Sequence, residues 1–143
     1  MQLDDLYRRV IMDHYKKPRN YGMFIEDHDD TIMIHVNNPA CGDRISLQLQ
    51  VNNDMIQNAR FTGEGCSISL SSASMMTDAV KGKTLTEAFH WAERFFAMVK
   101  GDDVTFDEYE DIEALSGVCK FPARIKCATL PWNALQQGIE NLQ

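Results

Sequence analysis

The sequence lacks any apolar run long enough to cross a membrane, and its basic residues are outnumbered by its acidic ones. It opens with MQLDDLYRRV, which has two acidic residues where a signal peptide needs basic residues and an apolar block. We therefore expect a cytoplasmic protein with no membrane contact. Its 14 Lys and Arg against 21 Asp and Glu give a net charge of −7. Nucleic-acid binders need clustered Lys and Arg, so no nucleic-acid partner is expected.

The familiar signatures of zinc enzymes and paired metal ligands are also missing. The chain has no HExxH, no HxE with PCxxC and no CxxC pair, so neither a metalloprotease nor a deaminase is indicated. Its four cysteines are Cys41, Cys66, Cys119 and Cys127. A reducing compartment disfavours two disulfides, which leaves metal binding, redox chemistry and simple burial open.

The length and the hydrophobic pattern predict one α+β domain over residues 1–143. Apolar residues at helical spacing alternate along the chain with stretches of period two. The predicted elements are a helix over 3–16, strands over 31–38, 44–51 and 55–62, a helix over 67–80, a helix opened by a capping box at Thr84–Glu87, and a last helix ending near Leu142. The expected fold is a three-stranded antiparallel sheet packed against several helices.

Three local features carry more specific expectations. His14 is interpreted as a residue at the edge of the first helix. The stretch 102–113 holds seven acidic residues and is predicted to be an exposed loop with at most a helical turn. Pro131 fits best in the first turn of the last helix, where the N–H that proline lacks has no partner within the helix.

Four residues near element ends form a candidate metal site. Cys41 and Asp43 are two apart on a segment predicted to be extended, so their side chains point the same way, and Gly42 lets the loop bend. Cys66 follows Gly63-Glu64-Gly65 at a strand-to-helix turn, and Cys127 lies near the start of the last helix. Three thiolates and a carboxylate can hold zinc tetrahedrally.

On spacing alone, a set of buried thiols with Asp43 capping a helix is equally open. Cys119 has no comparable setting and is interpreted as an incidental thiol. A zinc ion with four protein ligands has no open position for water and is typical of a structural site. A site with one harder ligand could instead release a cysteine as a nucleophile.

Four segments carry a resemblance to a known family: LYRRVIMDHYKKPRNYG, NPACGDRISL, FTGEGCSISLSSASMMTDAVKGK and FPARIKCATLPWNAL. In content and order they resemble the IscU/NifU N-terminal family of iron–sulfur cluster assembly proteins, and within it the SufU branch. The resemblance implies a SufE/NifU-like, IscU-type fold. It also implies that Cys41, Asp43, Cys66 and Cys127 are the metal ligands.

Two features separate the branches of this family. Cluster scaffolds of the IscU type carry a histidine immediately before the last ligand cysteine, where this chain has Lys126. The acidic stretch after Gly101, running to Val118, resembles the insertion of the SufU branch. Members with these features are zinc proteins that accept sulfur from a cysteine desulfurase, and the resemblance implies that role here.

Three hypotheses follow. In the first, the chain is a zinc-dependent sulfurtransferase: Cys41 takes persulfide sulfur from a desulfurase of the SufS type and passes it towards a cluster scaffold of the SufBCD type. Arg124, one turn before Cys127, then either pairs with a displaced Asp43 or makes a surface salt bridge. The second is a scaffold that binds a [2Fe–2S] cluster on the same ligands. The third is a purely structural zinc module.

Overall fold

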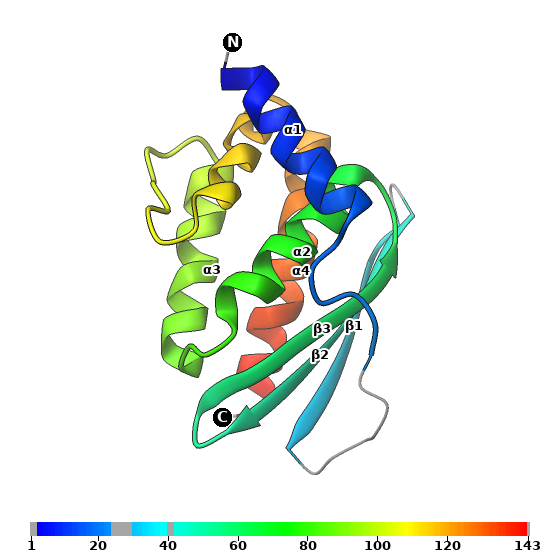
Figure 1. The fold of residues 1–143 in the computed structure, drawn as a ribbon, viewed down its shortest axis with the longest axis vertical. Coiled ribbons are helices and arrows are strands. Elements are labelled where there is room, and N and C mark those ends of the chain that lie inside the picture. The colour runs from blue at the N-terminus through cyan, green and yellow to red at the C-terminus, as the bar shows by residue number, and fades with distance from the viewer. Residues whose placement is uncertain (1–2, 24–29, 40–41, 143) are drawn as a thin grey trace.

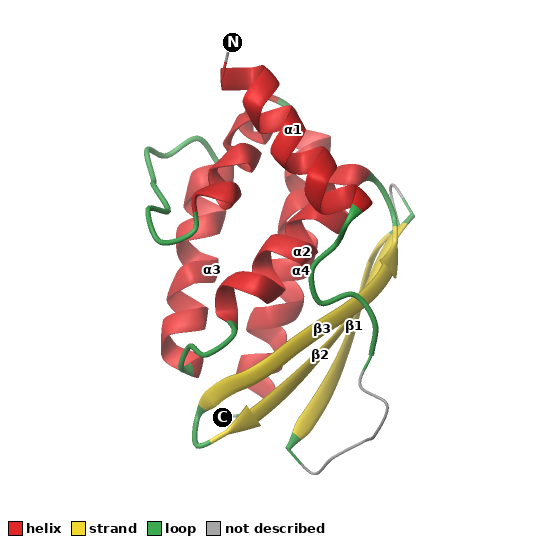
Figure 2. Ribbon diagram, in the orientation of Figure 1, coloured by secondary structure: helices red, strands yellow, loops and turns green. Residues whose placement is uncertain are grey.

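The structure is a computed structural model that describes residues 3–23, 30–39 and 42–142. Its elements are α1 (Leu3–Lys16), β1 (Thr31–Asn38), β2 (Asp43–Asn52), β3 (Met55–Glu64), α2 (Ser67–Val80), α3 (Leu85–Val99), the 3₁₀ helix η1 (Glu110–Lys120) and α4 (Pro122–Asn141). Figures 1 and 2 show the sheet on one side of the molecule with the helices gathered against one of its faces. The predicted α+β class is confirmed.

The sheet is an antiparallel meander in the order β1-β2-β3, as predicted. A tight turn joins β2 to β3, and its residues Asn53 and Asp54 have φ angles of 55° and 61°. Asn and Asp tolerate this left-handed conformation better than most side chains, which suits them to a hairpin turn. The register pairs Arg44 with Glu64, so the start of β2 lies beside the end of β3.

Helices α2 and α4 cover the sheet, and α3 packs on the far side of α4 (Figure 2). Helix α4 comes close to β1 at Gly138, where an added Cβ would lie 2.7 Å from Cδ1 of Ile34. On its other side α4 contacts α3 through Trp132 and Phe95, whose rings stack with centroids 4.7 Å apart. A larger residue than glycine at position 138 would push α4 away from the sheet.

The interpretation of His14 as a helix-edge residue is wrong. Its side chain is fully buried and joins three elements that are distant in the sequence. Nδ1 lies 2.7 Å from the hydroxyl of Ser74 in α2, and Nε2 lies 2.8 Å from the Asp111 carboxylate in η1. Buried polar groups need such partners, and here they hold α1 against α2.

The prediction of an exposed loop over 102–113 is only partly right. Phe106 and Ile112 are fully buried, and residues from Glu110 onward form η1. Tyr109 donates a hydrogen bond to Asp78 at 2.7 Å. Burial, followed by this hydrogen bond, raises the pKa of Tyr109 above its usual value. Most of the acidic side chains therefore face solvent, Asp111 and Glu113 make hydrogen bonds within the protein, and the apolar residues attach the segment to the core.

Helix α4 begins earlier than predicted, at Pro122. Pro122 takes the N-terminal position that was expected of Pro131, and Pro131 lies inside the helix. A proline there removes one backbone hydrogen bond. Thr129 on the same helix donates its hydroxyl to the carbonyl of Ile125 at 3.0 Å.

None of the helices within the described ranges is long and apolar enough to cross a membrane.

Candidate metal centre

Asp43, Cys66 and Cys127 converge at one end of the sheet. Asp43 is the first residue of β2, and the β2–β3 register places it beside the segment that follows Glu64. Cys66 lies in that segment, at the N-cap of α2. The hairpin therefore brings together two residues that are 23 positions apart in the sequence.

The Asp43 carboxylate is 1% exposed and its two oxygens have different surroundings. Oδ1 accepts a hydrogen bond from the backbone N–H of Cys66 at 2.9 Å. Oδ2 lies 3.8 Å from Sγ of Cys66. One oxygen thus holds the start of α2 while the other is directed towards the sulfur. The helix-capping interpretation of Asp43 and the ligand interpretation are compatible, because each uses a different oxygen.

Gly65 permits this close approach. A Cβ at position 65 would lie 2.3 Å from Oδ1 of Asp43 and 2.7 Å from the Ser69 hydroxyl oxygen. Real Cβ atoms do not come so near to other atoms, so any side chain at this position would displace the carboxylate. Glycine is therefore required before Cys66 for steric reasons, in addition to the freedom that it gives the backbone at the turn.

Cys127 reaches the same place from α4. It lies in the second turn of that helix, since α4 starts five residues before it, and it is 2% exposed. Its sulfur lies 3.6 Å from the carbonyl oxygen of Ala123, to which the thiol can donate. The Ser72 hydroxyl in α2 donates to the carbonyl of Ala128 at 2.6 Å. That buried bond fixes α2 and α4 to each other directly beside the cysteine.

The three residues fit a metal ion by their chemistry and their spacing. One ligand atom from each lies within 4.8 Å of the other two. Ligand atoms around a tetrahedral zinc with Zn–S bonds of about 2.3 Å are spaced about 3.5–4 Å apart. Two thiolates with one carboxylate suit zinc, and thiolates also suit iron–sulfur clusters. This centre could hold either.

Cys41, the predicted fourth ligand, lies outside the described residues. Its neighbour Gly42 has a φ of 75°, and the Gly42 N–H donates to the carbonyl of Asn38 at 2.9 Å. The expectation of an extended segment is therefore wrong at Gly42, which closes a tight turn before β2. The assignment of Cys41 as a ligand stays a prediction.

Arg124, Lys126 and Cys119 were the other residues singled out by the sequence, and their surroundings differ from those of the three convergent residues. Arg124 and Lys126 are on exposed positions of α4. Within the described part of the chain Arg124 makes no ion pair, so neither of the partners considered for it is seen. Cys119 is partly buried near Gly101, and among the described residues the metal-ligand group does not include it.

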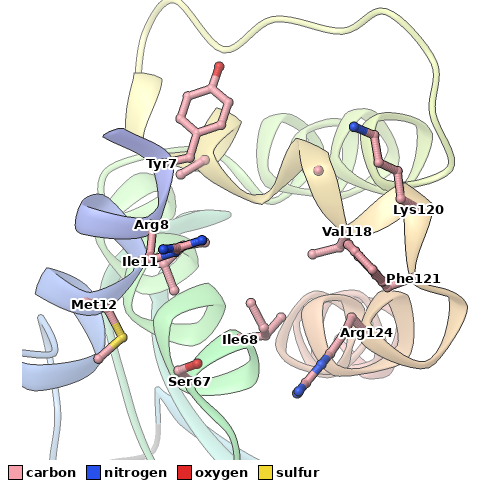
Figure 3. Close-up of a pocket in the computed structure, with 12 residues that line it drawn as sticks. Tyr7, Arg8, Ile11, Met12, Ser67, Ile68, Val118, Lys120, Phe121 and Arg124 are labelled. Atoms are coloured by element: carbon pink, nitrogen blue, oxygen red, sulfur yellow. The ribbon is translucent and has the colours of Figure 1, made fainter. Parts of the chain in front are cut away.

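An open groove of about 650 Å³ includes in its lining Ser67, the residue after Cys66, and Arg124, which lies one helical turn before Cys127 (Figure 3). Helix α1 supplies Arg8 and Met12 on one side, and η1 and α4 supply Lys120 and Arg124 on the other. The charged residues that line it are all basic, although the protein carries a net charge of −7. Phe121 lies at the groove with 61% of its surface exposed.

Comparison with known proteins identifies relatives over almost the whole chain. The family model of the NifU-like N-terminal domain matches residues 6–143. The zinc-dependent sulfurtransferase SufU of Bacillus subtilis is 53% identical over 138 residues, covering 96% of this chain and 91% of the relative. The iron–sulfur cluster assembly scaffold protein IscU of Streptococcus pyogenes is 45% identical over 140 residues, covering 97% and 86% respectively.

Solved structures agree with the fold. A proposed iron–sulfur cluster assembly scaffold protein for the SUF system from Fervidobacterium islandicum superposes with a TM-score of 0.79 at 30% identity, over 91% of this chain and 93% of that one. The N-terminal part of a NifU-like protein from Brucella abortus gives a TM-score of 0.86 at 20% identity, over 97% and 95%. The second likeness concerns the fold alone.

Proposed function

The chain belongs to the family of NifU-like N-terminal domains, and from that membership we propose that it is a zinc-dependent sulfurtransferase of iron–sulfur cluster assembly. The observation that carries the proposal is the convergence of Asp43, Cys66 and Cys127, of which Asp43 and Cys127 are buried and Cys66 is partly buried, in a group of one carboxylate and two thiols. The 53% identical relative from Bacillus subtilis is named for this activity. The substrate is a persulfide held by a partner cysteine desulfurase.

In this proposal the chain's residues divide into holders and one acceptor. Asp43, Cys66 and Cys127 would hold a zinc ion, and Cys41 would complete the ligand set and act as the reacting thiol. Bound zinc supplies one chemical effect, which is to keep its cysteine ligands deprotonated near neutral pH. The three holders are fixed by β2, α2 and α4, so they can keep their positions while Cys41 leaves the site.

The transfer step needs no external oxidant or reductant. The Cys41 thiolate attacks the outer sulfur of the partner's persulfide and forms a new S–S bond. The S–S bond within the partner's persulfide breaks, and its cysteine leaves with the electron pair as a thiolate. The outer sulfur keeps its proton, so Cys41 ends as a persulfide and the partner is ready for another turnover.

The basic groove is the surface that we assign to the desulfurase. Its lining includes Ser67, which directly follows Cys66 in the sequence, and its cations Arg8, Lys120 and Arg124 would attract an acidic partner surface. Its apolar lining, with the exposed Phe121, offers the contact area that fixes a partner in place. Transfer onward to a scaffold of the SufBCD type in the cytoplasm, where thiols stay reduced, completes the proposal.

The scaffold hypothesis is the second candidate, because the 45% identical relative is named an iron–sulfur cluster assembly scaffold. Metal analysis of freshly purified protein with a visible spectrum separates the two. One zinc per chain and no colour is expected for the sulfurtransferase. Brown protein with iron and sulfide would replace the proposal with the scaffold.

The role of Cys41 has its own test. Cys41→Ser should abolish the stimulation of the desulfurase, measured as alanine production, while the thermal unfolding transition stays cooperative. Cys119→Ser is the matched control, since it removes a thiol outside the metal group, and it should stimulate like the wild type. Full stimulation by Cys41→Ser, with the persulfide on Cys66 or Cys127, would remove Cys41 from its role.

A further inference from the structure

Ser69 has a hydroxyl beside the metal centre that neither the ligand set nor the proposed transfer step uses. It is the third residue of α2 and is fully buried. Its oxygen lies 3.8 Å from Sγ of Cys66, and its hydroxyl donates to the carbonyl of Cys66 at 3.1 Å. On the other side it faces Gly65, where an added Cβ would approach it to 2.7 Å.

Two groups lie near the Cys66 sulfur, and metal binding to that sulfur would change which of them can donate to it. As a thiol, Cys66 carries one proton and has two acceptors at 3.8 Å, the Asp43 carboxylate and the Ser69 oxygen. As a thiolate it has no proton and needs donors instead. Asp43 is a carboxylate and has none to give. Ser69 has a hydroxyl proton and lies within reach.

We propose that Ser69 is a positioning residue of the metal centre: in the metal-bound protein its hydroxyl donates to the Cys66 thiolate and keeps that cysteine as a retained ligand. This proposal rests on the proposed function only in taking Cys66 as a metal ligand. A hydrogen bond from a neighbouring side chain orients a ligand and spreads its charge, and such partners typically affect metal affinity about 10–100-fold. Buried on α2, Ser69 can rotate its hydroxyl from the Cys66 carbonyl to its sulfur without moving its backbone.

The chain contains a matched control for this serine. Ser71 lies two residues further along the same helix, is also fully buried, and also donates to a carbonyl three residues earlier, that of Ile68 at 3.2 Å. It takes no part in the group around Cys66. Ser69→Ala and Ser71→Ala therefore remove the same kind of bond from the same helix, and only the first removes a donor near the sulfur.

The experiment measures zinc release from the full chain to a chromogenic chelator, without the desulfurase. Ser69→Ala should release zinc about tenfold faster than the wild type, whereas Ser71→Ala should stay within about twofold. With Co²⁺ in place of zinc, the sulfur-to-cobalt charge-transfer band of Ser69→Ala should shift and that of Ser71→Ala should not. Ser69→Thr, which keeps the hydroxyl, should restore slow release.

The outcomes are distinguishable. Equal release rates and unshifted cobalt spectra for Ser69→Ala and Ser71→Ala would overturn the role of Ser69 and leave the sulfurtransferase proposal standing. Wild-type protein that holds no zinc would overturn both. If Ser69→Ala does not fold, Ser69→Thr and Ser69→Cys decide: fast zinc release from both would show that the side chain matters by its volume and not as a hydroxyl donor.

Discussion

Helices α2 and α3 begin at opposite ends of the β2–β3 hairpin and are capped in different ways. At α3 the cap is local: Glu87 N–H donates to the Thr84 hydroxyl at 3.1 Å, and Thr84 N–H donates to the Glu87 carboxylate at 3.2 Å. At α2 the N-cap residue is Cys66, whose side chain makes no capping bond. A carboxylate from another element, Asp43, accepts the Cys66 N–H instead.

The difference shows how a helix start can also be part of a metal site. Ser69 occupies the position in α2 that Glu87 occupies in α3, but the carboxylate that accepts the N-cap N–H comes from β2. As a result the Cys66 sulfur makes no capping bond to the backbone of α2, whereas the Thr84 hydroxyl accepts the capping bond of α3. The α3 cap forms from four consecutive residues, and the α2 start needs the folded sheet.

The largest expected effect comes from removing zinc, which should affect the start of α2 and leave the start of α3 unchanged. Ligands from β2, α2 and α4 make metal binding part of the folding free energy. Zinc at a thousandfold excess over its dissociation constant stabilises by about 4 kcal/mol, so a chelator should lower the melting temperature by about 10 °C. Hydrogen exchange should quicken at residues 66–70 and not at residues 85–88.

A Cys127→Ser variant is the control for chelation. It lacks one of the proposed zinc ligands, so its melting temperature should change little when the chelator is added. An unchanged melting temperature after verified zinc removal would contradict the coupling. Equal acceleration of exchange at both helix starts would contradict the contrast between them.

Asp43→Cys separates the two tasks of the carboxylate. With four thiolates the zinc site becomes of the closed, structural kind, so zinc should be held more tightly and desulfurase stimulation should fall by about tenfold, equivalent to ~1.4 kcal/mol. The zinc-free variant should also lose about 1 kcal/mol of stability, because the oxygen that accepts the Cys66 N–H is gone. Competitive chelation, alanine production and denaturant unfolding measure the three effects.

Stimulation at the wild-type level by Asp43→Cys would show that exchange at this ligand set is not how the protein works. A longer-lived [2Fe–2S] cluster in this variant would instead favour the scaffold hypothesis.

The smallest expected effect is that of Thr84→Ala, which removes the local cap of α3. The free energy of unfolding should fall by about 1 kcal/mol, the usual contribution of such a cap. Zinc release should match the wild type, because Thr84 lies at the other end of the hairpin from Asp43. Thr84→Ser keeps the hydroxyl and should restore stability. Faster zinc release from Thr84→Ala would show that the two helix starts are not independent.

Much of this architecture was predictable from the sequence because its signals are local. The strict alternation over 31–38 gave β1 with the correct bounds, and Thr84 with Glu87 formed the expected capping box. Placement at element ends and the family resemblance pointed to Asp43, Cys66 and Cys127, which the fold brings together.

The rest depends on contacts that no local pattern contains. The sequence pattern places His14 near the end of a helix, where a polar residue is usually exposed. Its burial depends on hydrogen bonds to Ser74 and Asp111, which are 60 and 97 positions away in the sequence. Phe106 and Ile112 are isolated apolar residues in an acidic stretch. The charges around them favour the prediction of an exposed loop, so the pattern does not show that these two side chains are buried. The prediction put Pro131 in the first turn, but Pro122 begins the helix and Pro131 lies inside it. The packing of a buried helix can compensate for the one backbone hydrogen bond that is lost there.

The positions of the three convergent residues along the chain set the order in which the centre can be made during synthesis. A ribosome that has released β2, β3 and α2 has produced Asp43 and Cys66, but the third donor appears only when α4 emerges. At about 5–20 residues per second, several seconds pass between Cys66 and Cys127. Until then the nascent chain offers a metal ion two of these three donors, so loading at the complete centre is a late event and marks a chain whose last helix has docked.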